Sequence, residues 1–262
     1  MGILNITPDS FSDGGRFFNP DDGLRQMEKM LAEGTDIIDI GGESTRPGAQ
    51  AVSLEEELAR VIPLIERLRA ESDIFISVDT SKAVVMREAV AAGADMINDV
   101  RALREPGALQ TAAALQTPVC LMHMQGQPRS MQRQPEYQDV VAEVKAFLDA
   151  RVNVCEKAGI AREQLVIDPG FGFGKTLEQN LTLFRQLPDF QSFGRPILVG
   201  VSRKSMIGAV LDIPVQERMP ASVALAGLAV WLGASIIRTH DVRETADAVK
   251  MCLAVVNGTA SE

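Results

Sequence analysis

Eight short apolar runs along the chain are each followed by a polar or ionisable side chain. These side chains are Asn5, residues 43–46 (ESTR), Asp79, Asn98 with Asp99, His123, Asp168, residues 202–205 (SRKS), and Arg238 with His240. Amide, carboxylate and cationic groups are costly to bury at the end of an apolar run unless they face a ligand or one another. Their repetition after every run therefore indicates one binding or catalytic site rather than eight separate packing solutions.

The charges within this set divide it into two parts. Carboxylates follow the third, fourth and sixth runs, at Asp79, Asp99 and Asp168. Since an ionised carboxylate only accepts hydrogen bonds, these residues together with Asn98 suit a planar ligand that carries several N–H donors. Cationic side chains follow the seventh and eighth runs, at Arg203, Lys204, Arg238 and His240. Arginine and lysine suit a phosphate group, so the pattern predicts a donor-rich heterocycle beside an anion.

The elements that would position these residues alternate regularly. We expect strands at Gly2–Ile6, Asp36–Ile40, Ile74–Val78, Met96–Asp99, Pro118–Met122, Leu165–Ile167, Ile197–Val201 and Ile236–Arg238, because short apolar runs are typical of strands buried on both faces. Helical periodicity predicts helices at Asp21–Glu33, Leu54–Arg69, Ala83–Ala92, Gly107–Leu115, Val140–Ala158, Leu177–Leu187, Met219–Leu232 and Glu244–Val256. Eight strands and eight helices with no linker predict an α/β fold, a single-domain (β/α)8 TIM barrel over residues 1–262. An open doubly wound sheet is the alternative, because periodicity does not show closure.

The C-terminal ends of all strands in such a barrel meet at one rim, where the catalytic residues of these folds lie. The first two connections at that rim, residues 7–20 and 41–53, are long and rich in Gly, Pro, Ser and Asp. Long connections without a helix of their own are often functional covers. We therefore expect these two connections to close over the pocket.

Composition excludes several classes of protein. The chain has 262 residues, 46% of them hydrophobic, and a formal net charge of −9 without a basic block, which argues against non-specific nucleic-acid binding. Its three cysteines, Cys120, Cys155 and Cys252, are too few and too widely spaced for a disulfide framework. The N-terminus lacks the basic start and apolar stretch of a signal peptide, and no apolar run is long enough to span a membrane. We expect a cytoplasmic protein with small-molecule ligands and with no nucleic-acid or membrane partner.

Some residues near the rim have a simpler structural interpretation. His123 is expected to be a hydrogen-bonded core residue, Met122 part of a pocket wall, and Asp99 an acceptor for neighbouring backbone groups. The acidic run Glu55 to Glu57 is predicted to lie on a solvated helix face. The segment DPGFGFGK (residues 168–175) lacks the spacing from an earlier glycine that a nucleotide-binding P-loop requires.

Taken together, the motifs resemble those of the dihydropteroate synthase family, the pterin-binding enzymes of bacterial folate biosynthesis. The matching segments are MGILNITPDSFSDGG, DIGGESTRPGA, SVDTSK, INDV, CLMHMQGQP, DPGFGFGK, LVGVSRKSMIG and IIRTHDV. They lie at the ends of the expected strands, in the family's order, over essentially the full chain. A series of motifs in register is far more specific than a single glycine motif. Family members also carry a segment before the first strand that caps the barrel, and we expect this N-terminal cap to be absent here.

The resemblance implies a transferase of tetrahydrofolate biosynthesis. The enzymes of this family join (7,8-dihydropterin-6-yl)methyl diphosphate to 4-aminobenzoate and release diphosphate and 7,8-dihydropteroate. It further implies an SN1-like step, Mg²⁺ as cofactor, a homodimer, and inhibition by sulfonamides, which mimic 4-aminobenzoate.

The resemblance also assigns roles to particular residues. The pterin-binding residues of the family fall on Asp79, Asn98, Met122, Asp168, Lys204 and Arg238. The residues that hold the diphosphate fall on Asn5, Thr45, Arg238 and His240, and Asn5 is the expected magnesium ligand. The 4-aminobenzoate site falls on Thr45, Pro47, Phe173, Lys204 and Ser205. The expected catalytic residues are Asp79, Lys204, Asp13 and Phe11, of which the last two lie in the first long connection.

Three other functions are compatible with parts of the pattern. A pterin-dependent methyltransferase domain shares the fold and the pterin pocket but needs a corrinoid partner, and the SRKS, RTHD and STRPG motifs favour the synthase. A catalytically silent pterin-binding paralogue would be expected to have lost the SFSDGG and STRPG residues that are present here. A phosphosugar isomerase or lyase on the same fold would need a Glu or Lys base at the rim that the pattern does not supply.

Overall fold

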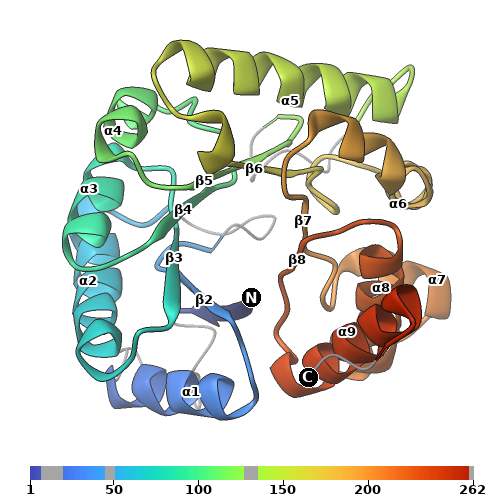
Figure 1. Cartoon of the computed structure of the whole chain (residues 1–262), viewed down its shortest axis with the longest axis horizontal. Coiled ribbons are helices and arrows are strands. Elements are labelled where there is room, and N and C mark those ends of the chain that lie inside the picture. The colour runs from blue at the N-terminus through green and yellow to red at the C-terminus, as the bar shows by residue number, and fades with distance from the viewer. Residues whose placement is uncertain (7–19, 45–50, 127–134, 260–262) are drawn as a thin grey trace.

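Strands and helices alternate around a ring in the computed structural model (Figure 1), which describes residues 1–6, 20–44, 51–126 and 135–259. The strands are β1 (Gly2–Asn5), β2 (Ile37–Gly41), β3 (Phe75–Asp79), β4 (Met96–Asp99), β5 (Val119–Met122), β6 (Leu165–Asp168), β7 (Leu198–Val199) and β8 (Ile236–Ile237). The α-helices are α1 (Pro20–Ala32), α2 (Leu54–Glu71), α3 (Ala83–Ala91), α4 (Ala108–Leu115), α5 (Val140–Lys157), α6 (Leu177–Arg185), α7 (Ser205–Leu211), α8 (Met219–Trp231) and α9 (Val242–Asn257). Short 3₁₀ turns are η1 (Arg162–Gln164), η2 (Leu187–Phe193) and η3 (Val215–Glu217).

The pairings between these strands are parallel and close the sheet on itself. β1 to β6 pair in sequence order, and β7 pairs with β8. Ile167 bridges to Ile197 just before β7, and Gly2 bridges to Thr239 just beyond β8. At the contact between β8 and β1, the N–H of Ile3 also donates a 2.9 Å hydrogen bond to the carbonyl of Thr239. The predicted (β/α)8 barrel is therefore confirmed, whereas an open doubly wound sheet would leave the outer strands unpaired.

The interior of the barrel changes from apolar to polar along the strands. A buried apolar cluster inside the barrel contains Met1, Met96, Cys120, Val166 and Leu198. Side chains alternate between the two faces of a strand, so the residues two positions after Met96 and Val166 point into the same interior. Those residues are Asn98 and Asp168, which lie at or near the carboxyl ends of β4 and β6. The alternation thus brings polar side chains together at the rim.

The larger hydrophobic core lies between the barrel and the surrounding helices (Figure 1). Ile38, Ile40 and Val78 face outward from the strands and are fully buried, and α2 packs against them with a stripe that includes Val61 and Leu64. Each fully buried aliphatic side chain of this kind stabilises the fold by about 1.5–3 kcal/mol. This core holds the strands in the register that positions the rim.

The observed elements agree with the expected ones to within two residues at each end. Helix α7, at Ser205–Leu211, was missed. Its seven residues are too few for a helical period to be distinguished from an apolar run. In the described part of the chain, no helix has the length and apolar character needed to cross a lipid bilayer.

Candidate active site

The first four strands end in a row of polar side chains at the rim. The strand register pairs Asn5 with Gly41, Gly41 with Asp79, and Asp79 with Asn98 across β1 to β4. A Cβ at Gly41 would lie 3.5 Å from Asn5 Oδ1 and 3.4 Å from Asp79 Cβ. Gly41 therefore separates the Asn5 amide from the Asp79 carboxylate without filling the space between them.

Arg238 connects two buried carboxylates at this rim. Its Nε donates to Asp39 Oδ2 at 2.6 Å, and its Nη2 donates to Asp79 Oδ2 at 2.9 Å. Arg238 follows β8, whereas Asp39 and Asp79 belong to β2 and β3, so the guanidinium reaches past β1 to both. Charge-assisted hydrogen bonds between an arginine and carboxylates are among the strongest in proteins, and here they fix the position of all three side chains.

Burial and charge determine how Asp79 and Arg238 titrate. Burial raises the pKa of Asp79 to about 7, and the carboxylates of Asp39, Asp99 and Glu57 add to this shift while Arg238 opposes it. Burial also disfavours the charge on Arg238, but Asp39 and Asp79 outweigh it and raise the pKa of the guanidinium above its ordinary value. Arg238 therefore stays charged, and Asp79 is the group that gains or loses a proton near neutral pH.

Asp39 is a site residue that the sequence analysis missed. It is fully buried, and its Oδ2 accepts hydrogen bonds from Arg238 and, at 3.1 Å, from the Asn98 amide. Because a carboxylate only accepts, this contact sets the orientation of Asn98. Among the described residues, Asp39 Oδ1 and the nearby Ser77 Oγ have no hydrogen-bond partner. The inner wall of the rim thus contains polar atoms that the protein itself leaves unsatisfied.

Lys204 approaches the rim from the connection after β7. Its Nζ donates to the carbonyl oxygen of Phe171 and lies 4.6 Å from the centre of the Phe173 ring. A Cβ at Gly200 would lie 4.0 Å from Lys204 Nζ and 3.8 Å from Arg238 Cβ, so the two cationic residues converge above β7. Burial lowers the pKa of Lys204 to about 8, and Arg238 contributes to that shift while Asp168 opposes it.

Asp168 ends β6 on the same side of the barrel. It is buried, and its Oδ1 accepts a hydrogen bond of 2.7 Å from the N–H of Gly170. Burial raises the pKa of Asp168, against the opposing effect of Lys204. Asp168 and Lys204 are therefore further opposite charges at the rim, and each acts on the pKa of the other.

An apolar wall accompanies these charges. Met122 is buried in a cluster with Val100 and Met124, and Phe173 packs against that cluster. Met122 on β5 pairs with Asp168 on the neighbouring strand β6. The expectation that Met122 is a wall residue therefore agrees with its surroundings, and the wall provides a flat apolar contact for an aromatic ligand.

The remaining predicted residues lie near the ends of β7 and β8. Ser202 Oγ lies 3.0 Å from His240 Nδ1 and accepts a 3.2 Å hydrogen bond from the His240 backbone N–H. Ser205 is exposed at the start of α7. Phe11, Asp13, Thr45 and Pro47 lie outside the described residues.

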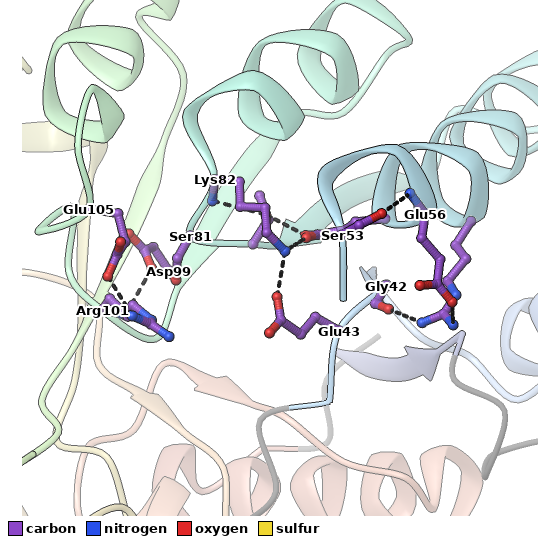
Figure 2. A network of polar contacts seen from close by, with 12 residues as sticks. Gly42, Glu43, Ser53, Glu56, Ser81, Lys82, Asp99, Arg101 and Glu105 are labelled. Atoms are coloured by element: carbon purple, nitrogen blue, oxygen red, sulfur yellow. Dashed lines mark hydrogen bonds and ion pairs between the residues drawn. The ribbon is translucent and has the colours of Figure 1, made fainter. Parts of the chain in front are cut away.

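A charged network fixes the beginning of the second long connection (Figure 2). Lys82 Nζ donates to Glu43 Oε2 at 2.6 Å and also to Glu57, and Glu57 accepts a 2.6 Å hydrogen bond from Thr80. Glu57 is 1% exposed, so the prediction that this part of the acidic run is solvated was wrong. The residue occupies the buried face of α2 one turn before Val61, and this spacing was the signal that could have identified it.

Two other interpretations agree with the structure. Asp99 accepts hydrogen bonds from the backbone N–H groups of Arg101 and Leu103 at 2.8 and 2.7 Å. His123 is buried and hydrogen-bonded within the core. Within the described residues, no cluster of three or more His, Cys, Asp or Glu side chains could hold a metal ion.

A cleft between α5 and η2 lies on the outside of the barrel, away from the rim. Its lining residues include Lys145 and Arg195.

Comparisons with known proteins extend over almost the whole chain. A family model described as "Pterin binding enzyme" matches residues 1–240. The dihydropteroate synthase of Haemophilus influenzae is 58% identical over 257 residues, which cover 98% of this chain and 94% of the relative. A crystal structure of Yersinia pestis dihydropteroate synthase with a sulfonamide drug has a TM-score of 0.94 and 52% identity, covering 98% of this chain and 93% of that one. Xanthomonas albilineans dihydropteroate synthase with 4-aminobenzoic acid has a TM-score of 0.92 and 51% identity, with coverage of 97% and 92%.

Proposed function

The chain belongs to the family of pterin-binding enzymes, and we propose that the residues at its barrel rim carry out the dihydropteroate synthase reaction. The activity is that of a transferase of folate biosynthesis: 7,8-dihydropteroate and diphosphate are formed from (7,8-dihydropterin-6-yl)methyl diphosphate and 4-aminobenzoate. The observation that carries the assignment to the rim is the gathering of buried opposite charges there. Arg238 is hydrogen-bonded to Asp79, and Asp168 and Lys204 are further opposite charges at the same rim, beside an apolar wall.

The pterin is assigned to the space between these pairs. Asp79 and Asp168 are buried carboxylates that accept hydrogen bonds from the ring N–H groups, and Asn98 both donates and accepts. Met122 and the guanidinium plane of Arg238 lie against the faces of the ring. The unpartnered oxygens of Asp39 and Ser77 support a polar ligand here, because buried polar atoms without partners are otherwise unfavourable.

The proposed reaction begins with loss of diphosphate. The bond between the pterin methylene carbon and the diphosphate oxygen breaks, and the electron pair leaves with the diphosphate. The resulting pterin cation is stabilised by the anionic carboxylate of Asp79, a preorganised charge in a buried site. The amine nitrogen of 4-aminobenzoate then attacks the methylene carbon and loses one of its two protons to the released diphosphate, which gives 7,8-dihydropteroate. Asp13 and Phe11 are proposed to help exclude water during this step.

The diphosphate is assigned to Asn5, Thr45, Arg238 and His240. Asn5 supplies a neutral amide oxygen at the end of β1, which suits a Mg²⁺ ion that keeps most of its waters and relies on substrate phosphates for binding. When bound, Mg²⁺ supplies electrostatic stabilisation of the leaving group.

The 4-aminobenzoate is assigned to Phe173, Lys204 and Ser205, with Thr45 and Pro47. The Lys204 ammonium above the Phe173 ring is suited to a molecule that has both an aromatic ring and a carboxylate. Sulfonamides mimic this substrate and target the activity, as the complex of the Y. pestis relative illustrates.

The molecule is further proposed to act as one domain over residues 1–262, in the cytoplasm and as a homodimer. Support for the dimer comes from large apolar side chains on α8 and α9, where Leu228, Trp231, Met251 and Val255 are each more than half exposed. Exposed apolar patches of this kind are typical of protein interfaces.

The requirement for magnesium gives a direct test of the proposed chemistry. The protein is incubated with dihydropterin diphosphate and radiolabelled 4-aminobenzoate, and labelled dihydropteroate is measured by chromatography. Addition of EDTA is expected to reduce product formation by about 10²-fold or more, since the metal stabilises the leaving diphosphate. Excess Mg²⁺ is expected to restore it. Undiminished turnover in EDTA would contradict the metal assignment.

The pH dependence of kcat/KM is expected to be bell-shaped. The ionised fraction of Asp79 increases as the pH rises through its pKa of about 7, so activity increases on the acid side. The charged fraction of Lys204 decreases as the pH rises through about 8, so activity decreases on the basic side. The variant Lys204→Arg keeps its charge and is expected to lose the basic limb. A flat profile between pH 6 and 9 would contradict this ionisation scheme.

A further inference from the structure

Lys175, at the end of the DPGFGFGK segment, is a buried amine that the proposed reaction does not use. It is 2% exposed. Its Nζ lies 3.0 Å from His123 Nδ1, 2.8 Å from the carbonyl oxygen of Gly170 and 3.1 Å from that of Phe173. Three contacts match the three N–H donors of an ammonium group. No carboxylate among the described residues forms a direct ion pair with it. Burial lowers the pKa of Lys175 to about 7, while Asp168 opposes this shift.

His123 provides the acceptor for this lysine. Burial lowers the pKa of His123 far below its ordinary range, and Lys175 adds to the shift, so the imidazole is neutral. The protonated amine of Lys175 can only donate, so in that state Nδ1 is the acceptor and the proton of the neutral ring lies on Nε2. The ring lies edge-on to Phe147 at a centroid distance of 4.9 Å and tilted against Tyr137 at 6.1 Å. These aromatic contacts hold Nδ1 toward the lysine.

The two carbonyl groups that bind Lys175 belong to the connection between β6 and α6. This connection packs closely against the end of β5, because a Cβ at Gly170 would lie 1.9 Å from the His123 carbonyl oxygen. Gly170 also has a φ of +72°, a conformation that favours glycine. The same connection carries Phe173, which lies under the Lys204 ammonium, and Phe171, whose carbonyl accepts from Lys204. Lys175 therefore joins the end of β5 to the segment that contacts Lys204.

We propose that Lys175 and His123 are a positioning pair that fixes the β6–α6 connection so that Phe173 and Lys204 are aligned for 4-aminobenzoate. This inference rests on the proposed function. The pterin contacts of Asp79, Asn98 and Arg238 come from strands and strand ends outside this connection, whereas Asp168 touches it through the N–H of Gly170. Loss of the pair therefore raises the KM for 4-aminobenzoate more than the KM for the dihydropterin diphosphate. A lysine with only a structural role would instead change the stability of the protein without a different effect on the two KM values.

The test compares KM values for the two substrates in four variants. Lys175→Met removes the donors while keeping an unbranched side chain, and His123→Leu removes the acceptor. Both are expected to raise the KM for 4-aminobenzoate by about 10-fold or more, with a change of less than about 3-fold for the dihydropterin diphosphate. His123→Asn places its amide oxygen near the position of Nδ1 and is expected to recover most of the affinity lost in His123→Leu. Lys157→Met, an exposed lysine at the end of α5, is the matched control and is expected to behave like the wild type.

The outcomes separate this inference from the function on which it rests. Wild-type product formation establishes the function independently of any variant. Equal KM changes for both substrates, or no change in either, would overturn the positioning role. If Lys175→Met does not fold, as judged by circular dichroism and thermal unfolding, the inference is tested by comparing the KM for 4-aminobenzoate in His123→Asn and His123→Leu. Equal KM values in those two variants would then overturn the inference.

Discussion

The variant Asp79→Asn is expected to lower kcat/KM for dihydropteroate formation by about 10²- to 10³-fold, while the fold is retained. The substitution keeps the shape of the side chain but removes the anion that accepts from Arg238 at 2.9 Å. In the proposed reaction, that anion stabilises the pterin cation and accepts from the ring N–H groups. Product formation in the radiolabel assay measures the loss, with Asp149→Asn on the exposed surface of α5 as the control.

The stability of the same variant provides a second readout with a defined sign. Folding raises the pKa of the Asp79 carboxyl to about 7. Ionised Asp79 therefore lowers the free energy of unfolding at any pH above the pKa that this carboxyl has in the unfolded chain. As the pH falls below about 7, Asp79 becomes protonated in the folded protein and this cost is progressively relieved. At pH 8 Asp79→Asn is therefore expected to be at least as stable toward urea as the wild type. Full activity of the variant, or its unfolding at pH 8, would contradict the role given to Asp79.

Arg238→Met is expected to have the largest effect on stability of any single change at the rim. The guanidinium neutralises both Asp39 and Asp79, and its removal leaves two buried carboxylates without a counter-charge. Breaking a buried ion pair from one side costs about 3–5 kcal/mol. Urea unfolding at pH 8 measures this cost, and turnover is expected to be abolished as well.

A double variant distinguishes charge from packing in this prediction. Arg238→Met combined with Asp39→Asn removes one of the two uncompensated charges, so part of the lost free energy of unfolding is expected to return, while activity is not. Such non-additivity is expected of residues in direct contact. If the two substitutions simply add, the stabilising role of Arg238 at Asp39 would be wrong.

The sequence was sufficient to predict the barrel and most of its rim. Runs of apolar residues with a polar residue after each place Asp79, Asn98 and Asp168 at the ends of parallel strands, and closure of the sheet brings those ends together. The pattern contains this information because side-chain alternation and the barrel geometry leave few other positions for these residues. Phe11, Asp13, Thr45 and Pro47 are assigned by resemblance alone.

Asp39 and Lys175 could not be identified in the same way, because their roles depend on partners far away in the chain. Asp39 lies inside the apolar run of β2 rather than after it, and its meaning depends on Arg238, 199 residues later. A charged residue within a buried run, two positions before Gly41, was the available signal. Lys175 lies in a glycine-rich segment that resembles a phosphate loop, and only its contact with His123, 52 residues earlier, distinguishes it.

The most direct test of the account is a crystal structure of the protein with the dihydropterin diphosphate bound. The central claim predicts the pterin ring inside the rim, with its N–H groups about 3 Å from the carboxylates of Asp79 and Asp168 and the diphosphate beside Arg238. A pterin bound elsewhere, for instance in the external cleft beside α5, or bound at the rim without contact to either carboxylate, would contradict it.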